Sequence, residues 1–188
     1  MIILGLDPSL CWYGWGLVRL SLDPTGLCKA LVLGAGCIRT APDARKRHLY
    51  QADQDAERLI ALARGVASAM RGETRAGSYA PIAHVVCEAP AGSQHARSAA
   101  ALGQAFGVTL GVATSLGRGL RFVQAHEVKL AVGGSKGASK AAVAAGVERL
   151  TGWRSTAKTQ PAREAEADAV AVALTMSVPS VTVGLPPT

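Results

Sequence analysis

Three carboxylate side chains, far apart in the sequence, each lie at or beside the end of an apolar segment. Asp7 ends the run 1–7, Glu88 ends a central run, and Asp168 lies in a C-terminal pattern typical of an apolar helix. Removing a lone carboxylate from water is costly unless a partner neutralises it. We therefore expect the three groups to converge on one site, where a hard divalent cation such as Mg²⁺ would suit their oxygens.

The charge balance points to a polyanionic partner. The chain has 188 residues, of which 49% are hydrophobic and only 4% aromatic, and its formal net charge is +7. A positive surface around an acidic pocket favours metal-dependent chemistry on a nucleic acid, although solubility alone would also explain the charge. The length fits one domain, which we place at 1–178, with a tail at 179–188 that we expect to be disordered.

The cysteine spacing and the hydropathy pattern argue against several other classes of protein. Cys11, Cys28, Cys37 and Cys87 form no Cys-x-x-Cys pair and match no zinc module. No signal peptide is visible, so we expect free thiols and a cytoplasmic location. The longest apolar stretches are far shorter than the ~20 residues that a membrane-spanning helix needs, and we expect no membrane association.

Hydrophobic periodicity and turn residues predict a single sheet with helices on its faces, which is an α/β fold. The first three strands are joined by short turns and should form an antiparallel meander. Ser139 is the expected N-cap of a helix. The predicted strands are 1–6, 12–20, 28–38, 82–88 and 120–124, the predicted helices are 50–70, 95–116, 125–132, 139–150 and 164–177, and the predicted loops include 71–80, 133–140 and 152–163.

A turn and a glycine-rich strand follow Asp7. The segment 7–16 reads Asp-Pro-Ser-Leu-Cys-Trp-Tyr-Gly-Trp-Gly, which sets a carboxylate beside a backbone that a phosphate can approach closely. This pattern resembles the RuvC-type Holliday junction resolvases, a branch of the RNase H-like nucleases with bacteriophage-type members. In that family the first strand ends in Asp-Pro-Gly and returns through Gly-aromatic-Gly, and here only Ser9 departs from it.

The resemblance extends along nearly the whole chain, from Met1 to about Thr175. Glu88 stands where the family has its second acid, and the segment 103–108 matches a Gly-Gln-x-x-Gly-Val helix of the family. Asp168 opens an Asp-Ala-aliphatic-Ala run like the family's last one. The resemblance implies an RNase H-like fold, with a central mixed five-stranded sheet flanked by helices.

The resemblance also implies a crossover junction endodeoxyribonuclease that resolves Holliday junctions by paired nicks. Such an enzyme would hydrolyse phosphodiesters with two Mg²⁺ ions, for which Mn²⁺ would substitute. Asp7 would bridge the ions, Glu88 and Asp168 would each bind one, and Lys140 would assist at the phosphate. Each of these side chains also has an ordinary structural alternative, such as a turn cap or a solvated element end.

The fourth ligand is open between two glutamates. The family often has an acid three residues before its last Asp, but this chain has Ala165 there, flanked by Glu164 and Glu166. On a regular helix Glu164 shares a face with Asp168 while Glu166 points nearly opposite, which favours Glu164. A helix that begins at residue 166 would favour Glu166 instead.

We expect basic side chains to contact the backbone of four-way junction or other branched DNA. The candidates are Lys129, Lys136, Lys140, Arg97 and Arg118. Family resolvases are homodimers, and by resemblance the small residues of helix 95–116 would form the dimer surface. Some members stack an aromatic residue on a base three positions after the second acid, where this chain has Ala91.

Three alternatives remain. The same fold could serve a nuclease of broader range that cuts branched DNA or processes RNA, which the loss of an aromatic residue at 91 would fit. A second alternative is a protein that binds junctions without cutting them. The Gly-Leu-Asp opening also resembles the phosphate loop of actin-like kinases, but those need two such domains, so no nucleotide cofactor is expected.

Overall fold

The computed structural model describes residues 1–42, 50–74, 77–78, 81–90, 92 and 95–177. The predicted tail at 179–188 and the position of Ala91 lie outside these residues. Among the described helices, none combines the length and the apolar character needed to span a lipid bilayer.

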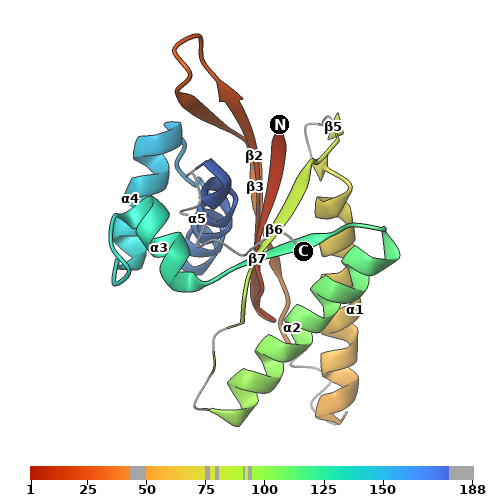
Figure 1. Cartoon of the computed structure of the whole chain (residues 1–188). Coiled ribbons are helices and arrows are strands. Elements are labelled where there is room, and N and C mark those ends of the chain that lie inside the picture. Colours follow the sequence, from red (N-terminus) through yellow and green to blue (C-terminus); the bar gives the residue numbers. More distant parts are fainter. Residues whose placement is uncertain (43–49, 75–76, 79–80, 91, 93–94, 178–188) are drawn as a thin grey trace, which may run out of the picture.

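One mixed five-stranded sheet forms the centre of the molecule (Figure 1). β1, β2 and β3 make the predicted antiparallel meander, while β6 and β7 run parallel to β1. The predicted RNase H-like sheet is therefore confirmed. In spatial order the strands are β3 (Cys28–Arg39), β2 (Trp12–Leu22), β1 (Ile2–Asp7), β6 (His84–Glu88) and β7 (Leu120–Val123).

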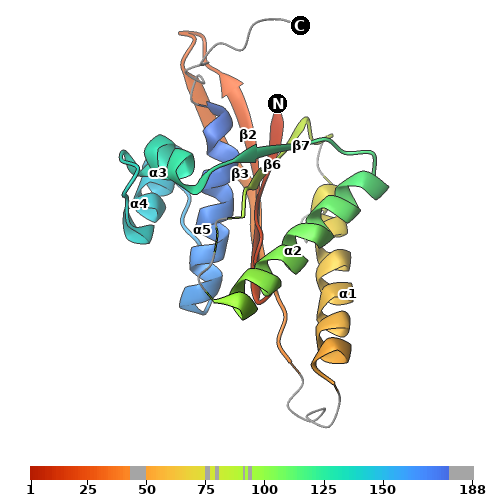
Figure 2. The same ribbon diagram turned by 60° about the horizontal axis from the view of Figure 1, so that its bottom comes forward.

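The helices cover both faces of this sheet. On one face α1 (Gln51–Met70) and α2 (Ala96–Ser115) pack on side chains such as Leu4, and on the other face the remaining helices pack on neighbours such as Ile3. The alternation of inward and outward side chains along a strand makes these two cores separate. Figures 1 and 2 show the two layers, the second of which contains α3 (Ala125–Gly133), α4 (Lys140–Thr151), α5 (Gln160–Leu174) and the 3₁₀ turn η2 (Thr175–Ser177).

Glycines allow α5 to lie directly on the backbone of the sheet. A Cβ atom added to Gly5 would lie 2.1 Å from the carbonyl oxygen of Ala169, and one added to Gly14 would lie 2.0 Å from that of Ala165. Such distances are far inside van der Waals contact, so any side chain at either glycine would push the helix away. This close packing fixes the height of α5 above β1 and β2.

Two elements differ from the sequence prediction. The prediction began the last helix at residue 164, whereas α5 begins at Gln160 because Pro161 fits the first helical turn, where its missing N–H costs nothing. The predicted loop 71–80 contains a small hairpin, β4 (Glu73–Thr74) with β5 (Gly77–Ser78). Strands of two residues are too short to leave a periodic signal.

The predicted N-cap at Ser139 is confirmed. The hydroxyl of Ser139 accepts a hydrogen bond of 3.2 Å from the backbone N–H of Ala142, which caps α4. Lys140 is the first residue of that helix, so the cap holds its position relative to α5.

Candidate active site

Asp7 and Glu88 lie side by side at one end of the sheet. Parallel pairing aligns Leu6 of β1 with Cys87 of β6. Asp7 and Glu88 are the next residues of these two strands. The three strand residues directly before each acid are buried, while both acids are partly exposed. Parallel neighbours present their carboxyl ends at the same edge, which is how two residues 81 positions apart come together.

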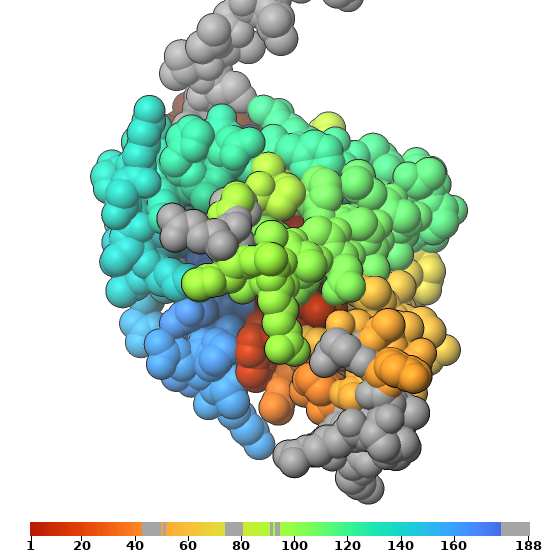
Figure 3. Space-filling model, turned by 90° about the horizontal axis from the view of Figure 1, so that it is seen from below, coloured from red at the N-terminus to blue at the C-terminus, as the bar shows by residue number. Residues whose placement is uncertain are grey.

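Asp168 joins them from the helix above. Asp7 pairs across the ladder with Gly14, and Gly14 contacts the α5 backbone at Ala165, one turn before Asp168. The chain segments that carry the three acids meet on the lower face of the molecule, toward which the carboxyl end of β1 runs (Figures 1 and 3).

Burial raises the pKa of all three carboxylates, and neighbouring acids add to the effect. Burial, followed by the charges of Glu88 and Asp168, raises the pKa of Asp7 from 3.8 to about 8. Burial and the charge of Asp168 also raise the pKa of Glu88. Burial raises the pKa of Asp168 against the opposing effect of Lys140. The cluster therefore concentrates negative charge that a cation would relieve.

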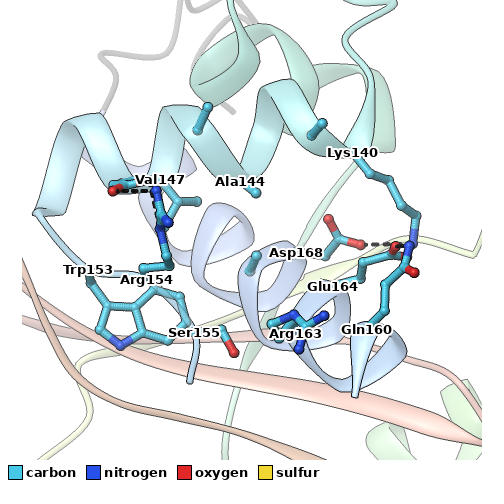
Figure 4. Close-up of a pocket in the computed structure, with 14 residues that line it drawn as sticks. Lys140, Ala144, Val147, Trp153, Arg154, Ser155, Gln160, Arg163, Glu164 and Asp168 are labelled. Atoms are coloured by element: carbon cyan, nitrogen blue, oxygen red, sulfur yellow. Dashed lines mark hydrogen bonds and ion pairs between the residues drawn. The ribbon is translucent and has the colours of Figure 1, made fainter. Parts of the chain in front are cut away.

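Lys140 lies against two acids of α5 (Figure 4). Its Nζ atom is 3.1 Å from Oε2 of Glu164 and 3.3 Å from Oδ2 of Asp168. Partial burial works against the charged form of Lys140, but Asp168 and Glu164 outweigh it and raise its pKa. Lys140 thus supplies one positive charge at the edge of the acidic cluster.

Glu164 and Glu166 lie on different sides of α5. Glu164 shares Lys140 with Asp168, and a hydrogen bond from Gln160, followed by that lysine, lowers its pKa. Glu166 instead accepts a hydrogen bond of 2.5 Å from the Ser155 hydroxyl. Because α5 is regular from Gln160 onward, only Glu164 shares the face of Asp168.

The cluster suits a metal ion in its chemistry, and its side chains would have to rearrange to bind one. All its donors are carboxylate oxygens, which hard divalent cations prefer. Within the described part of the chain, no three His, Cys, Asp or Glu side chains have the arrangement of a formed metal site. The lysine lies against two of the acids that an ion would require, so binding would first displace Lys140.

The structure places some of the predicted DNA-binding residues near the acidic cluster and others away from it. The charge of Lys129, on α3, counteracts the raised pKa values of Glu88 and Asp168, so it faces the cluster. Lys136 is exposed in the loop before α4. Arg118 lies at the opposite end of the sheet, where its Nη1 donates to the carbonyl oxygen of Ile82.

Arg97 lies in the first turn of α2. It lines a second cavity, of about 550 Å³, together with Leu10 from the turn after Asp7 and Gln104 from α2. The structure thus places Arg97 near the β1–β2 turn, on the other face of the sheet from Lys129 and Lys140.

A groove between α4 and α5 was not predicted. Its volume is about 420 Å³, and Lys140 and Asp168 line it together with Trp153, which follows the end of α4 (Figure 4). Alanines three and four residues apart on α4, with an aromatic residue after the helix, are the only signal in the sequence. That pattern is equally typical of ordinary helix packing.

Comparison with known proteins agrees with this geometry. The profile of the family described as crossover junction endodeoxyribonuclease RuvC matches residues 3–176. Two solved structures are similar, Thermus thermophilus RuvC with a Holliday junction substrate (TM-score 0.69) and Thermus thermophilus RuvC (TM-score 0.68). Each is 24% identical, over 93% of this chain and 92% of the other. A comparison with curated protein sequences gives no significant match.

The match to the RuvC profile spans the elements that carry all three acids, from β1 through β6 to α5. The two solved structures share the same fold over nearly the whole length of both chains. The chain therefore belongs to the RuvC family of crossover junction endodeoxyribonucleases.

Proposed function

We propose that this protein resolves Holliday junctions by metal-dependent hydrolysis of opposed phosphodiesters, and that residues 1–178 form its catalytic domain. The convergence of Asp7, Glu88 and Asp168 at one sheet edge carries this proposal. Burial, together with the charges of the other two acids, raises the pKa of Asp7 to about 8. Such a cluster, in a chain of net charge +7, fits a cation-dependent site for a polyanion.

Asp7, Glu88, Asp168 and Glu164 would hold the metal. Two bound Mg²⁺ or Mn²⁺ ions would activate water and stabilise the leaving oxygen. The charges of both Glu88 and Asp168 act on Asp7, which must lose its proton to bind a cation. Glu164 is the better fourth ligand, because Glu166 is engaged with Ser155 on another side of α5.

Lys140 would transfer its contact from protein to DNA. In the structure it forms ion pairs with Asp168 and Glu164. With DNA bound, its ammonium group would instead hold a phosphate oxygen beside them. Lys129 would hold the same strand from α3, while Lys136 and Arg97 would contact the backbone farther out. Arg118 has no part in this proposal because it lies at the far end of the sheet.

A homodimer would cut two strands in concert. Gly103, Gly107 and Gly111 form a smooth outward stripe on α2, since a Cβ atom added to any of them would meet no atom within 4 Å. Leu110, in the same stretch, is 40% exposed. These features support the packing of α2 against a second copy, with one acidic cluster in each subunit.

The first test is cleavage of a synthetic four-way junction beside a linear duplex of the same sequence. With Mg²⁺, we expect paired symmetric nicks in the junction alone, and no cutting by Asp7→Asn. Asp53→Asn, on an exposed first turn of α1, is the matched control and should cut normally.

The other outcomes separate the alternatives. Equal cutting of forks, flaps or RNA would indicate a nuclease of broader range. Tight junction binding without cutting, at any concentration of Mg²⁺ or Mn²⁺, would indicate a protein that only binds junctions. Full activity of Asp7→Asn would contradict the assignment of the acidic cluster.

A further inference from the structure

The groove between α4 and α5 opens beside the carboxylates, and hydrolysis itself makes no use of most of it. Its volume of about 420 Å³ lies in the range of sites that hold small organic groups. Lys140, Glu164 and Asp168 lie at one end of the groove, and Trp153 lies at the other (Figure 4). Any DNA strand held at the acids therefore passes the mouth of this groove.

The lining between these two ends is apolar and made of small side chains. Ala141, Ala144 and Ala145 of α4 face Ala167 of α5 across it. Methyl groups leave the space between the helices open and offer no partner to a charged ligand. A base-paired duplex is too wide to enter between two packed helices, whereas a single planar ring is of the right size.

Away from the acidic cluster, the charged groups at the rim already have partners. Arg154 pairs with Glu148 at 2.7 Å. Arg163 donates from Nη1 to two main-chain carbonyl oxygens. A phosphate would have to break these contacts, but an uncharged ring leaves them intact. The groove is therefore better suited to a heterocycle than to an anion.

We propose that the groove receives one nucleobase of the DNA, turned out of the helical stack at the nucleotide next to the scissile phosphate. This inference rests on the proposed function, since it requires a phosphate at the acidic cluster. The base passes Asp168, lies on the alanine floor and reaches the indole of Trp153, a surface on which every base can stack. The side chains of Gln160 and Ser155 offer polar atoms to the edge of the ring.

Such a groove would help to select branched DNA. Turning a base out of an intact duplex costs unpairing and unstacking energy, and the cost is least where the base is already unpaired. A nucleotide at a branch point has lost part of its stacking, so it enters the groove at lower cost than one within a duplex. The groove would thus discriminate by the deformability of DNA and not by its sequence alone.

The test uses the non-cutting Asp7→Asn protein and junctions that carry 5-iodouracil at single positions flanking the mapped cleavage point. Irradiation joins this base to an aromatic side chain that it stacks on. We expect a crosslink from one position to Trp153, identified by mass spectrometry. Ala144→Leu in the same background should abolish the crosslink by filling the groove. Ala61→Leu, on an exposed face of α1, is the matched control and should retain it.

An abasic nucleotide separates the loss of base binding from a general defect. Ala144→Leu should weaken junction binding roughly tenfold, the scale of one lost stacking contact. The penalty should vanish when the crosslinked nucleotide is abasic. An equal penalty on both junctions, or tight binding with crosslinks only to other residues, would overturn the groove proposal and leave the nuclease assignment intact. Failure of the Asp7→Asn protein to bind any branched DNA would overturn both.

Discussion

The ionisation of Asp7 affects the stability of the folded protein. Its pKa is about 8 in the folded chain and near 3.8 when solvated. The folded state therefore holds this proton more tightly than the unfolded state does. Its contribution to stability is fully present below pH 4 and is lost as the pH rises toward 8. Glu88 and Asp168, whose pKa values are also raised, change stability in the same direction.

We expect the melting temperature in EDTA to fall between pH 5 and pH 8.5, by roughly 5 °C for each ~2 kcal/mol lost. Asp7→Asn removes the largest part of this dependence, so the variant should melt above the wild type at pH 8. Adding Mg²⁺ at pH 8 should raise the melting temperature of the wild type more than that of the variant. Thermal unfolding, monitored by circular dichroism, measures these melting temperatures. A wild-type melting temperature that does not change with pH would contradict the raised pKa of Asp7.

The two glutamates of α5 give the second prediction at this scale. Glu164→Gln should lower the cleavage rate at least ~100-fold. Loss of a residue that only orients a metal ligand already costs up to about 100-fold, and loss of the ligand itself should cost no less. Glu166→Gln keeps an oxygen that can accept the hydrogen bond from Ser155, so its cleavage rate should stay within roughly threefold of wild type. Single-turnover cleavage over a range of Mg²⁺ concentrations compares them, and the reverse order would assign the ligand role to Glu166.

At the scale of elements, the site depends on how closely α5 approaches the sheet. Gly14→Ala would place a methyl group 2.0 Å from the Ala165 carbonyl oxygen, so the helix must shift. Overpacking of this kind costs about 1–3 kcal/mol, and the shift also moves Asp168 away from Asp7. We expect a lower melting temperature. We also expect cleavage to fall by more than the fraction of unfolded protein accounts for.

Gly137→Ala is the matched control for that variant, since an added Cβ there meets nothing within 4 Å. It should leave the denaturation midpoint in urea unchanged within error. If Gly14→Ala were equally harmless, backbone contact between α5 and the sheet could not be what positions the acids.

The elements that position Asp7 and Glu88 could be predicted because each ends a continuous apolar strand, a signal that lies within seven residues of sequence. The exact start of α5 could not be predicted, because Pro161 is compatible with both a loop and a first helical turn. The location of Arg118 and the α4–α5 groove could not be predicted either. Both follow from the way distant elements pack, which no local pattern contains.

At the scale of the whole molecule, paired nicking requires two sites that face one junction. Gly107→Leu, on the outward stripe of α2, should turn the proposed dimer into a monomer. Sedimentation equilibrium measures this state, with Ala61→Leu on α1 as the control for an added surface leucine. The monomer should nick one strand at a time, and a Gly107→Leu variant that stays dimeric would place the interface elsewhere.

The glycine contacts beneath α5 also determine where the protein can tolerate change. Backbone touches backbone there, so the spacing of the acids does not depend on the size of any particular core side chain. In a library of random variants, neighbouring valines and leucines should accept many apolar replacements, as cores of preserved volume do. Almost no replacement should be accepted at Gly5, Gly14 and Gly16. Functional clones should therefore keep these three glycines and the acids unchanged.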